Sequence, residues 1–313
     1  DDASVTVTLP GKAPGETLAF VSHLDTVPAG QGWTRPAFEP TIEGDRMFGR
    51  GSGDAKASVA AMLVAARDLA EAGGPSRGRV LVVLGYEEET KLTTMGTAVA
   101  RLGTIDAAVV GEPTNLEFAI AQRGLMMVDL VARGDQRHAG YATDTADFTN
   151  AIVELGLNLA RLQALFRGRI HPVLGLATAT PTMFESGISR NVTPPLARAV
   201  LDVRSTPSWT HPELAEALRS ALDVEVDVTS DRLVPCETPA GSRLLQAAQA
   251  VRPEGMVFGS PTCSDWVFVR DRDAIKCGPG TSRRSHTPDE YVDLPEVSAA
   301  RRFYRQLAQA YLA

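Results

Sequence analysis

Short apolar runs, each ending in polar residues, recur along the first 122 residues. The segments TLAFVSHLD, RVLVVLGYEEET and DAAVVGEPTN, and AIKCGPG later in the chain, contain the continuous hydrophobicity of buried parallel strands. In GRGSGDAKASVAAMLVAARDLAEAGG, a Gly-rich coil gives way at Asp54 to the apolar spacing of a long helix. This alternation predicts an α/β fold with a mostly parallel sheet.

The pattern changes after residue 122. Strand-like runs (GLMMVDLVARG, ARAVLDVRST and VEVDVTS) alternate there with helical runs (ADFTNAIVELGLNLARLQAL and HPELAEALRSAL), and a further helix follows around GSRLLQAAQAV. We therefore expect a first domain built from residues 1–122 and 236–313, with a compact α+β domain inserted at residues 123–235.

The first apolar run ends in a His and an Asp two residues apart. On an extended strand, His23 and Asp25 face the same side. A metal-bound imidazole needs a partner for its other ring nitrogen, and a nearby carboxylate commonly supplies it. This makes His23 a candidate metal ligand supported by Asp25; the alternative is a simple turn hydrogen bond between the two.

Further ligand-type residues stand where other elements begin or end. Asp54 precedes the long helix and is expected to be its N-cap, a role compatible with bridging two metals because a carboxylate has lone pairs to share. Three consecutive glutamates, residues 87–89, follow a core strand, where their mutual repulsion calls for a cation or a proton. Glu112 ends the next strand, and His286 lies in the loop after the last. Together these residues predict a metal site with an adjacent general base.

Seven motifs, in order along nearly the whole chain, resemble the M20 family of dizinc metallopeptidases and deacylases. They are SHLDTVP, GRGSGDAKAS, EEET, GEPTN, SRNVTPP, LDVRSTP and GPGTSRRSHTPDEYVD. The GEPT, TCSD and SHTPDEYV forms are most similar to the branch that deacetylates N-acetylornithine. The resemblance implies a catalytic domain that holds two divalent metals, zinc first with cobalt or manganese as alternatives.

Carried over position by position, the resemblance implies that Glu88 is the general base and that Asp25 supports His23. Because three glutamates are consecutive, a register displaced by one residue stays open. The implied metal ligands are His23, Asp54 as the bridge, Glu89, Glu112 and His286.

The resemblance also implies that the inserted domain is a lid and a dimerisation domain, so that the enzyme is a homodimer. His138 would then stabilise the oxyanion in the partner subunit's site, Asn191 would lie near the substrate and Arg204 would bind a substrate carboxylate. Taken without the family, the same residues could be a loop histidine, an Asx turn and a surface ion pair. His171 and His211 are expected to be structural.

The expected reaction is hydrolysis of the amide bond of a small N-acyl amino acid, N-acetylornithine first. Alternatives are a succinyl-diaminopimelate desuccinylase, a lysine-releasing carrier-protein hydrolase, a carboxypeptidase, or a non-catalytic amino-acid-binding scaffold. A missing ligand or base would mark the scaffold, and none is missing.

The composition of the chain limits which partners and which cellular compartment we expect. The net charge is −7 without a basic stripe, which argues against nucleic acid, and no apolar run approaches the length of a membrane span. The three cysteines show no redox or metal spacing, and no signal sequence opens the chain, so we expect a cytoplasmic protein. The chain starts at Asp1 in a strand, whereas the family has some tens of residues before it, which indicates a truncated or abbreviated amino terminus.

Overall fold

The computed structural model describes residues 4–142 and 148–313, which divide into two compact units. Unit 2 consists of Gln122–Cys236, close to the limits expected for the insertion, together with Gly259–Cys263, which the sequence pattern had assigned to the first domain. Unit 1 consists of Asp1–Ala121, Glu237–Phe258 and Ser264–Ala313.

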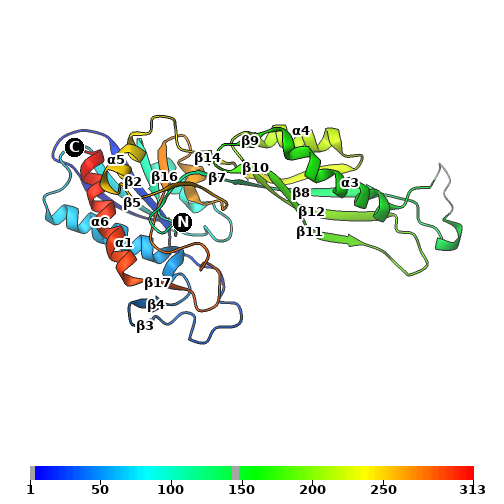
Figure 1. Ribbon diagram of the computed structural model, residues 1–313, viewed down its shortest axis with the longest axis horizontal. Coiled ribbons are helices and arrows are strands. Elements are labelled where there is room, and N and C mark those ends of the chain that lie inside the picture. The colour runs from blue at the N-terminus through cyan, green and yellow to red at the C-terminus, as the bar shows by residue number, and fades with distance from the viewer. Residues whose placement is uncertain (1–3, 143–147) are drawn as a thin grey trace. The chain divides into compact units, whose positions relative to one another are not determined.

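A mostly parallel sheet forms the centre of unit 1, as predicted (Figure 1). Its order is β1-β5-β2-β6-β16-β7-β14, with β15 beside β7. The four neighbours β5, β2, β6 and β16 run parallel, whereas β1 pairs with β5, and β7 with β16, in the antiparallel sense. The strands are β1 Val5–Pro10, β2 Thr17–His23, β5 Arg79–Gly85, β6 Ala107–Val110, β7 Phe118–Gln122, β14 Cys236–Glu237, β15 Val257–Ser260 and β16 Asp273–Lys276.

One face of this sheet is covered by three helices, which Figure 1 shows close together: α1 (Ala57–Glu71), α5 (Arg243–Val251) and α6 (Leu294–Tyr311). Leu18 and Phe20 of β2 point into this layer, because alternate side chains of a strand face the same side. Phe20 stacks at a tilt on Tyr304 of α6, with ring centroids 5.3 Å apart. A further helix, α2 (Thr94–Arg101), packs on β5, but its buried residues do not belong to the apolar core formed with α1, α5 and α6.

The parallel strands bring their carboxyl ends to one edge of the sheet. β2 ends at His23, β5 ends two residues before Glu87, and β6 ends two residues before Glu112. A separate three-stranded antiparallel sheet carries the segments just before Asp54 and just after His286. It consists of β3 (Thr41–Glu43), β4 (Arg46–Phe48) and β17 (Tyr291–Asp293). The loops that bear the ligand-type residues are thus fixed at one end of unit 1.

Unit 2 is built on an antiparallel sheet of order β11-β12-β8-β13. Two helices pack on it, and their apolar residues form one core with the inward side chains of β8 and β12. The sheet contains β8 Gly124–Arg133, β11 Thr178–Ser186, β12 Leu196–Ser205 and β13 Glu225–Leu233; the helices are α3 Ala151–Leu165 and α4 His211–Ala221, and a small ribbon pairs β9 Ile170–His171 with β10 Gly175–Leu176.

Two expectations about unit 2 need correction. The helix predicted from residue 146 begins only at Ala151, because Asn150 caps it by accepting the N–H of Ile152; residues 146 and 147 lie outside the described part of the chain. The strand β11 was not predicted, because it is an exposed edge strand interrupted by Pro181 and lacks the apolar alternation of a half-buried strand. Among the helices of residues 4–142 and 148–313, none is long and apolar enough to cross a membrane.

Candidate metal centre

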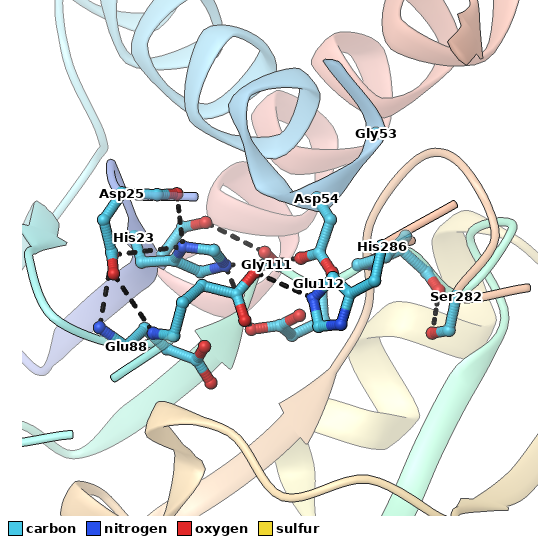
Figure 2. Close-up of polar contacts among 12 residues, drawn as sticks. His23, Asp25, Gly53, Asp54, Glu88, Gly111, Glu112, Ser282 and His286 are labelled. Carbon is cyan, nitrogen blue, oxygen red and sulfur yellow. Dashed lines mark hydrogen bonds and ion pairs between the residues drawn. The ribbon is translucent and has the colours of Figure 1, made fainter. Parts of the chain in front are cut away.

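His23 is held at the end of β2 with both ring nitrogens facing oxygen atoms. Its side chain is fully buried. Nδ1 lies 3.2 Å from the main-chain oxygen of Asp25 and 3.5 Å from its Oδ1. Nε2 faces the other way, 3.3 Å from Asp54 Oδ1 and 3.9 Å from Glu112 Oε1. Asp25 therefore orients the ring, and Nε2 is left directed into a group of carboxylates, as Figure 2 shows.

Asp54 does not cap the long helix, which corrects the prediction from its position. Helix α1 begins at Ala57, its N-cap position is Lys56, and no side chain caps it. The backbone of Asp54 is non-helical, with φ −115° and ψ 96°. Its side chain instead reaches both imidazoles, with Oδ1 3.3 Å from His23 and Oδ2 3.6 Å from His286.

The three glutamates after β5 separate into two that face the acidic cluster and one that faces away. Both oxygens of Asp25 accept main-chain hydrogen bonds, Oδ1 from Glu88 N at 3.2 Å and Oδ2 from Glu89 N at 3.1 Å. Glu87 has a left-handed φ of 70°, which turns the chain, and its carboxylate pairs with Lys91 and Thr93. The register with Glu88 and Glu89 in the cluster is therefore the one that this geometry supports.

Glu112 and His286 complete the cluster from two further loops. The Oε1 atom of Glu112 is buried without a hydrogen-bond partner, although it lies near His23. His286 is half exposed and has a left-handed φ of 64°; its Nε2 lies 2.9 Å from Glu89 Oε1. Strained backbone at residues that face a common point is typical of functional sites.

These side chains form two adjacent groups of possible metal ligands that share Asp54. One consists of His23, Asp54 and Glu112, and the other of Asp54, Glu89 and His286; within each, the ligand atoms lie within 4.8 Å of one another. A third overlapping group joins His23 to Glu88 and Glu89. Imidazole with carboxylate oxygens is a donor set that suits zinc, cobalt or manganese, and the unpartnered Glu112 oxygen is an unused donor.

The electrostatics of the protein groups alone require positive charge here. Burial lowers the pKa of His23, but hydrogen bonds to Asp25 and Asp54 and nearby negative charges outweigh this and hold it well above its usual value. Burial, with the charge of Asp54 next, raises the pKa of Glu112 to about 8. Burial, then the charge of Glu112, also raises the pKa of Glu88 well above its ordinary range. Two divalent cations would relieve this crowding of like charges.

The three candidate substrate residues lie in unit 2. His138 is exposed, and its Nδ1 accepts the N–H of Gly140. Its backbone pairs with Val192, and the oxygen of Asn191 accepts the N–H of Ala139, so the His138 and Asn191 loops lie side by side.

Arg204 is not part of this pair. It lies near the end of β12, whereas Asn191 precedes the start of that strand, which extends about 26 Å from Leu196 to Arg204 at roughly 3.3 Å per residue. Its guanidinium makes a bidentate ion pair with Asp202, with distances of 2.7 and 3.0 Å.

His171 and His211 are both engaged inside unit 2. His171 Nδ1 accepts the N–H of Leu174 at 3.0 Å, and His211 Nε2 lies 2.7 Å from Ser205 Oγ.

Two buried carboxylates beside this centre were not among the predicted site residues. Glu290 contacts the backbone at Asp54. Asp265 has a buried, unpartnered Oδ2, and burial raises its pKa to about 7. Both occur in quoted motifs, SHTPDEYVD and TCSD, which was the one available signal.

Comparison with known proteins decides the family. Residues 19–310 match the family described as Peptidase family M20/M25/M40. The chain belongs to this family. It is accordingly a metal-dependent amidohydrolase, the class that the motifs predicted.

Two curated relatives of this M20 protein carry different names. A succinyl-diaminopimelate desuccinylase from Cereibacter sphaeroides is 28% identical over 96% of this chain and 85% of its own length. An acetylornithine deacetylase from Myxococcus xanthus is 29% identical over 90% of this chain and 76% of its own. A solved Bacillus subtilis structure, described as a dinuclear metal-binding peptidase of the family, aligns with a TM-score of 0.73 at 16% identity over 98% of this chain and 84% of that one.

Proposed function

We propose that this M20 protein hydrolyses the amide bond of a small N-acyl amino acid with two divalent metal ions, one in each of the groups that share Asp54. The observation that carries the proposal is the placement of the two Asp54 oxygens, Oδ1 towards His23 and Oδ2 towards His286. Glu112 would complete the first site and Glu89 the second. Zinc is the expected metal, with cobalt or manganese as alternatives.

When bound, the two ions would polarise the acyl carbonyl and lower the pKa of the attacking water. Glu88 would act as general base, accepting a proton from that water and later donating it to the departing amine. Asp25 would keep Glu88 and His23 in place through its contacts with the backbone and the ring.

For the substrate we propose N-acetylornithine, with N-succinyl-diaminopimelate as the second candidate. The motif forms and the Myxococcus xanthus relative support the first, and the Cereibacter sphaeroides relative, which matches more of this chain, supports the second. Both are linear amides of amino acids with a second amino group, and they differ in the charge of the acyl group. A carrier-protein hydrolase, a carboxypeptidase and a non-catalytic scaffold have no such specific support.

We further propose that unit 2 is a lid that joins two subunits, and that His138 and Asn191 contact the substrate. The adjacency of the His138 and Asn191 loops supports a joint role. The role of Arg204 as a carboxylate-binding residue would require it to leave Asp202. We also propose a cytoplasmic location, because the three cysteines of the sequence are odd in number and show no redox or metal spacing.

The test is a panel of acetylated and succinylated amino acids, assayed with added zinc, cobalt or manganese. Purified Glu88→Gln protein serves as the control for contaminating activity. We expect metal-dependent release of a free amine from one acyl class. No turnover of any acyl amino acid, with dipeptides cleaved instead, would replace this proposal with a peptidase.

A further inference from the structure

We propose that Glu290 is a positioning residue that fixes the backbone at Asp54 and thereby sets the affinity for the metal ion beside His286. The inference rests on the proposed function, since it needs Asp54 to be a shared ligand. Glu290 is buried, with 1% of its surface exposed. Its Oε1 atom accepts hydrogen bonds from two consecutive main-chain N–H groups, Gly53 N and Asp54 N, both at 3.0 Å.

The segment that contains Asp54 needs such an anchor. Asp54 and Ala55 have non-helical backbone angles, so the regular hydrogen bonding of α1 does not extend to them. Gly51 upstream has a left-handed φ of 80°, and a Cβ there would lie 2.4 Å from Thr26 Cγ2. Figure 2 shows Gly53 just ahead of Asp54, on the turn from which the Asp54 side chain reaches towards His286. The two N–H groups are thus held by a side chain rather than by the helix.

The charge of Glu290 is balanced inside the protein. Its Oε2 lies 2.6 Å from Arg50 Nη1, and neither side chain is appreciably exposed. Arg50 in turn donates from Nη2 to the oxygen of Ala29 at 3.0 Å. A buried carboxylate without a partner would be costly, so the ion pair with Arg50 offsets the burial of Glu290 at this point.

The same residue links two ligand loops. Glu290 is four residues after His286, and its main-chain oxygen accepts the N–H of Gly49 at 2.9 Å. The next residue, Tyr291, pairs with Phe48 between β17 and β4. Through its side chain and backbone, Glu290 therefore fixes the segment of Asp54 relative to the segment of His286, and both belong to one of the two ligand groups.

The arrangement parallels that of Asp25 on the other side of the centre. Asp25 accepts the consecutive N–H groups of Glu88 and Glu89, and Glu290 accepts those of Gly53 and Asp54. In each case a carboxylate outside the groups of possible metal ligands holds the backbone of a ligand loop. Residues in this position commonly change metal affinity by about 10- to 100-fold when they are replaced.

Two substitutions separate the contact with the backbone from the ion pair. Glu290→Asp keeps the charge for Arg50 but withdraws the carboxylate by one bond, about 1.5 Å, from the two N–H groups. Glu290→Gln keeps an acceptor of the same reach but loses the charge that Arg50 needs. The control is Glu43→Gln, which breaks the exposed ion pair of Glu43 with Arg35 in the neighbouring small sheet.

Each full-length protein is stripped of metal and titrated with zinc in a metal buffer, and its thermal midpoint is measured without metal. For the ion beside His286 we expect the zinc affinity to fall about 10- to 100-fold in Glu290→Asp. The fall should be smaller in Glu290→Gln and absent in Glu43→Gln. The thermal midpoint should fall most in Glu290→Gln. Unchanged affinity in Glu290→Asp, or affinity losses that follow the thermal midpoints instead, would overturn the inference. Wild-type protein that fails to bind two ions would instead count against the proposed function.

Discussion

The end of unit 1 that carries the proposed metal ligands differs from the paired His138 and Asn191 loops of unit 2 in burial and in the contacts that hold it. At the metal end, buried carboxylates hold the ligand backbone from behind, and His23 is fully enclosed. In unit 2, His138 and Asn191 are exposed, and their side chains bond within their own loops, His138 to Gly140 and Asn191 to Ser189. Ligands must converge before the metal arrives, whereas substrate contacts can adjust when the substrate binds.

The shared ligand should be the least replaceable residue in the molecule. Asp54→Ala removes a donor from both ligand groups, so we expect activity to fall by more than about 10,000-fold, since activation of the water and polarisation of the carbonyl are lost together. Metal analysis after gel filtration should show fewer than one ion retained. Asp45→Ala, at an exposed position nearby, is the control and should behave as wild type. An active Asp54→Ala protein with its full metal content would exclude a bridging role.

Replacing the general base should lower turnover without releasing the metal ions. We expect Glu88→Gln to lower kcat by about 100- to 10,000-fold with its metal content retained, because the amide cannot take up the proton. Glu87→Gln should stay close to wild type, because Glu87 faces Lys91 and Thr93. If Glu87→Gln is dead and Glu88→Gln is active, the register is displaced by one.

The His138 loop should contribute to the active site of the partner subunit. His138→Ala should lower kcat by about 100- to 1000-fold if the imidazole stabilises an oxyanion. Mixing His138→Ala and Glu88→Gln subunits, both inactive, should restore about a quarter of wild-type activity, because half of the dimers are mixed and each of these has one intact site. An active monomer, or mixed dimers without recovery of activity, would show that His138 has no role in the partner subunit's active site.

The smallest expected effect is a pH dependence confined to unit 2. Burial lowers the pKa of His211, so the unfolded chain binds a proton more readily than the folded one. Stability should be complete above the unfolded pKa of roughly 6.5 and should decline as the pH falls through it. Hydrogen exchange of β12 and α4 at pH 7.5 and 5.5 would measure this, with His211→Asn as the control that should lose the dependence. Equal protection at both values would exclude it.

The ends of the core strands could be predicted because buried apolar runs have countable lengths. His23, Glu112 and the three glutamates at 87–89 were selected on that basis, and the parallel pairing of β2, β5 and β6 brings their segments to one edge. The choice of Glu88 and Glu89 among the three glutamates came from the resemblance to the family.

What escaped prediction depends on contacts between distant residues or on exposed segments. Nothing local to Asp54 reveals that its N–H is bound by Glu290, a residue 236 positions away. The N-cap role of Asp54 was wrong because its backbone is non-helical and α1 begins only at Ala57. The pairing of Arg204 with Asp202 was available from the sequence, since residues two apart on a strand share a face.

The most direct test of the account is the number of metal ions that one chain binds. Metal-free wild-type protein titrated with zinc and analysed for bound metal should approach two ions per chain, and activity should return as they bind. His23→Ala and His286→Ala should each retain about one ion, because each removes a ligand from only one of the two groups that share Asp54. A wild-type stoichiometry of one or none, or an unchanged stoichiometry in both variants, would contradict the central claim.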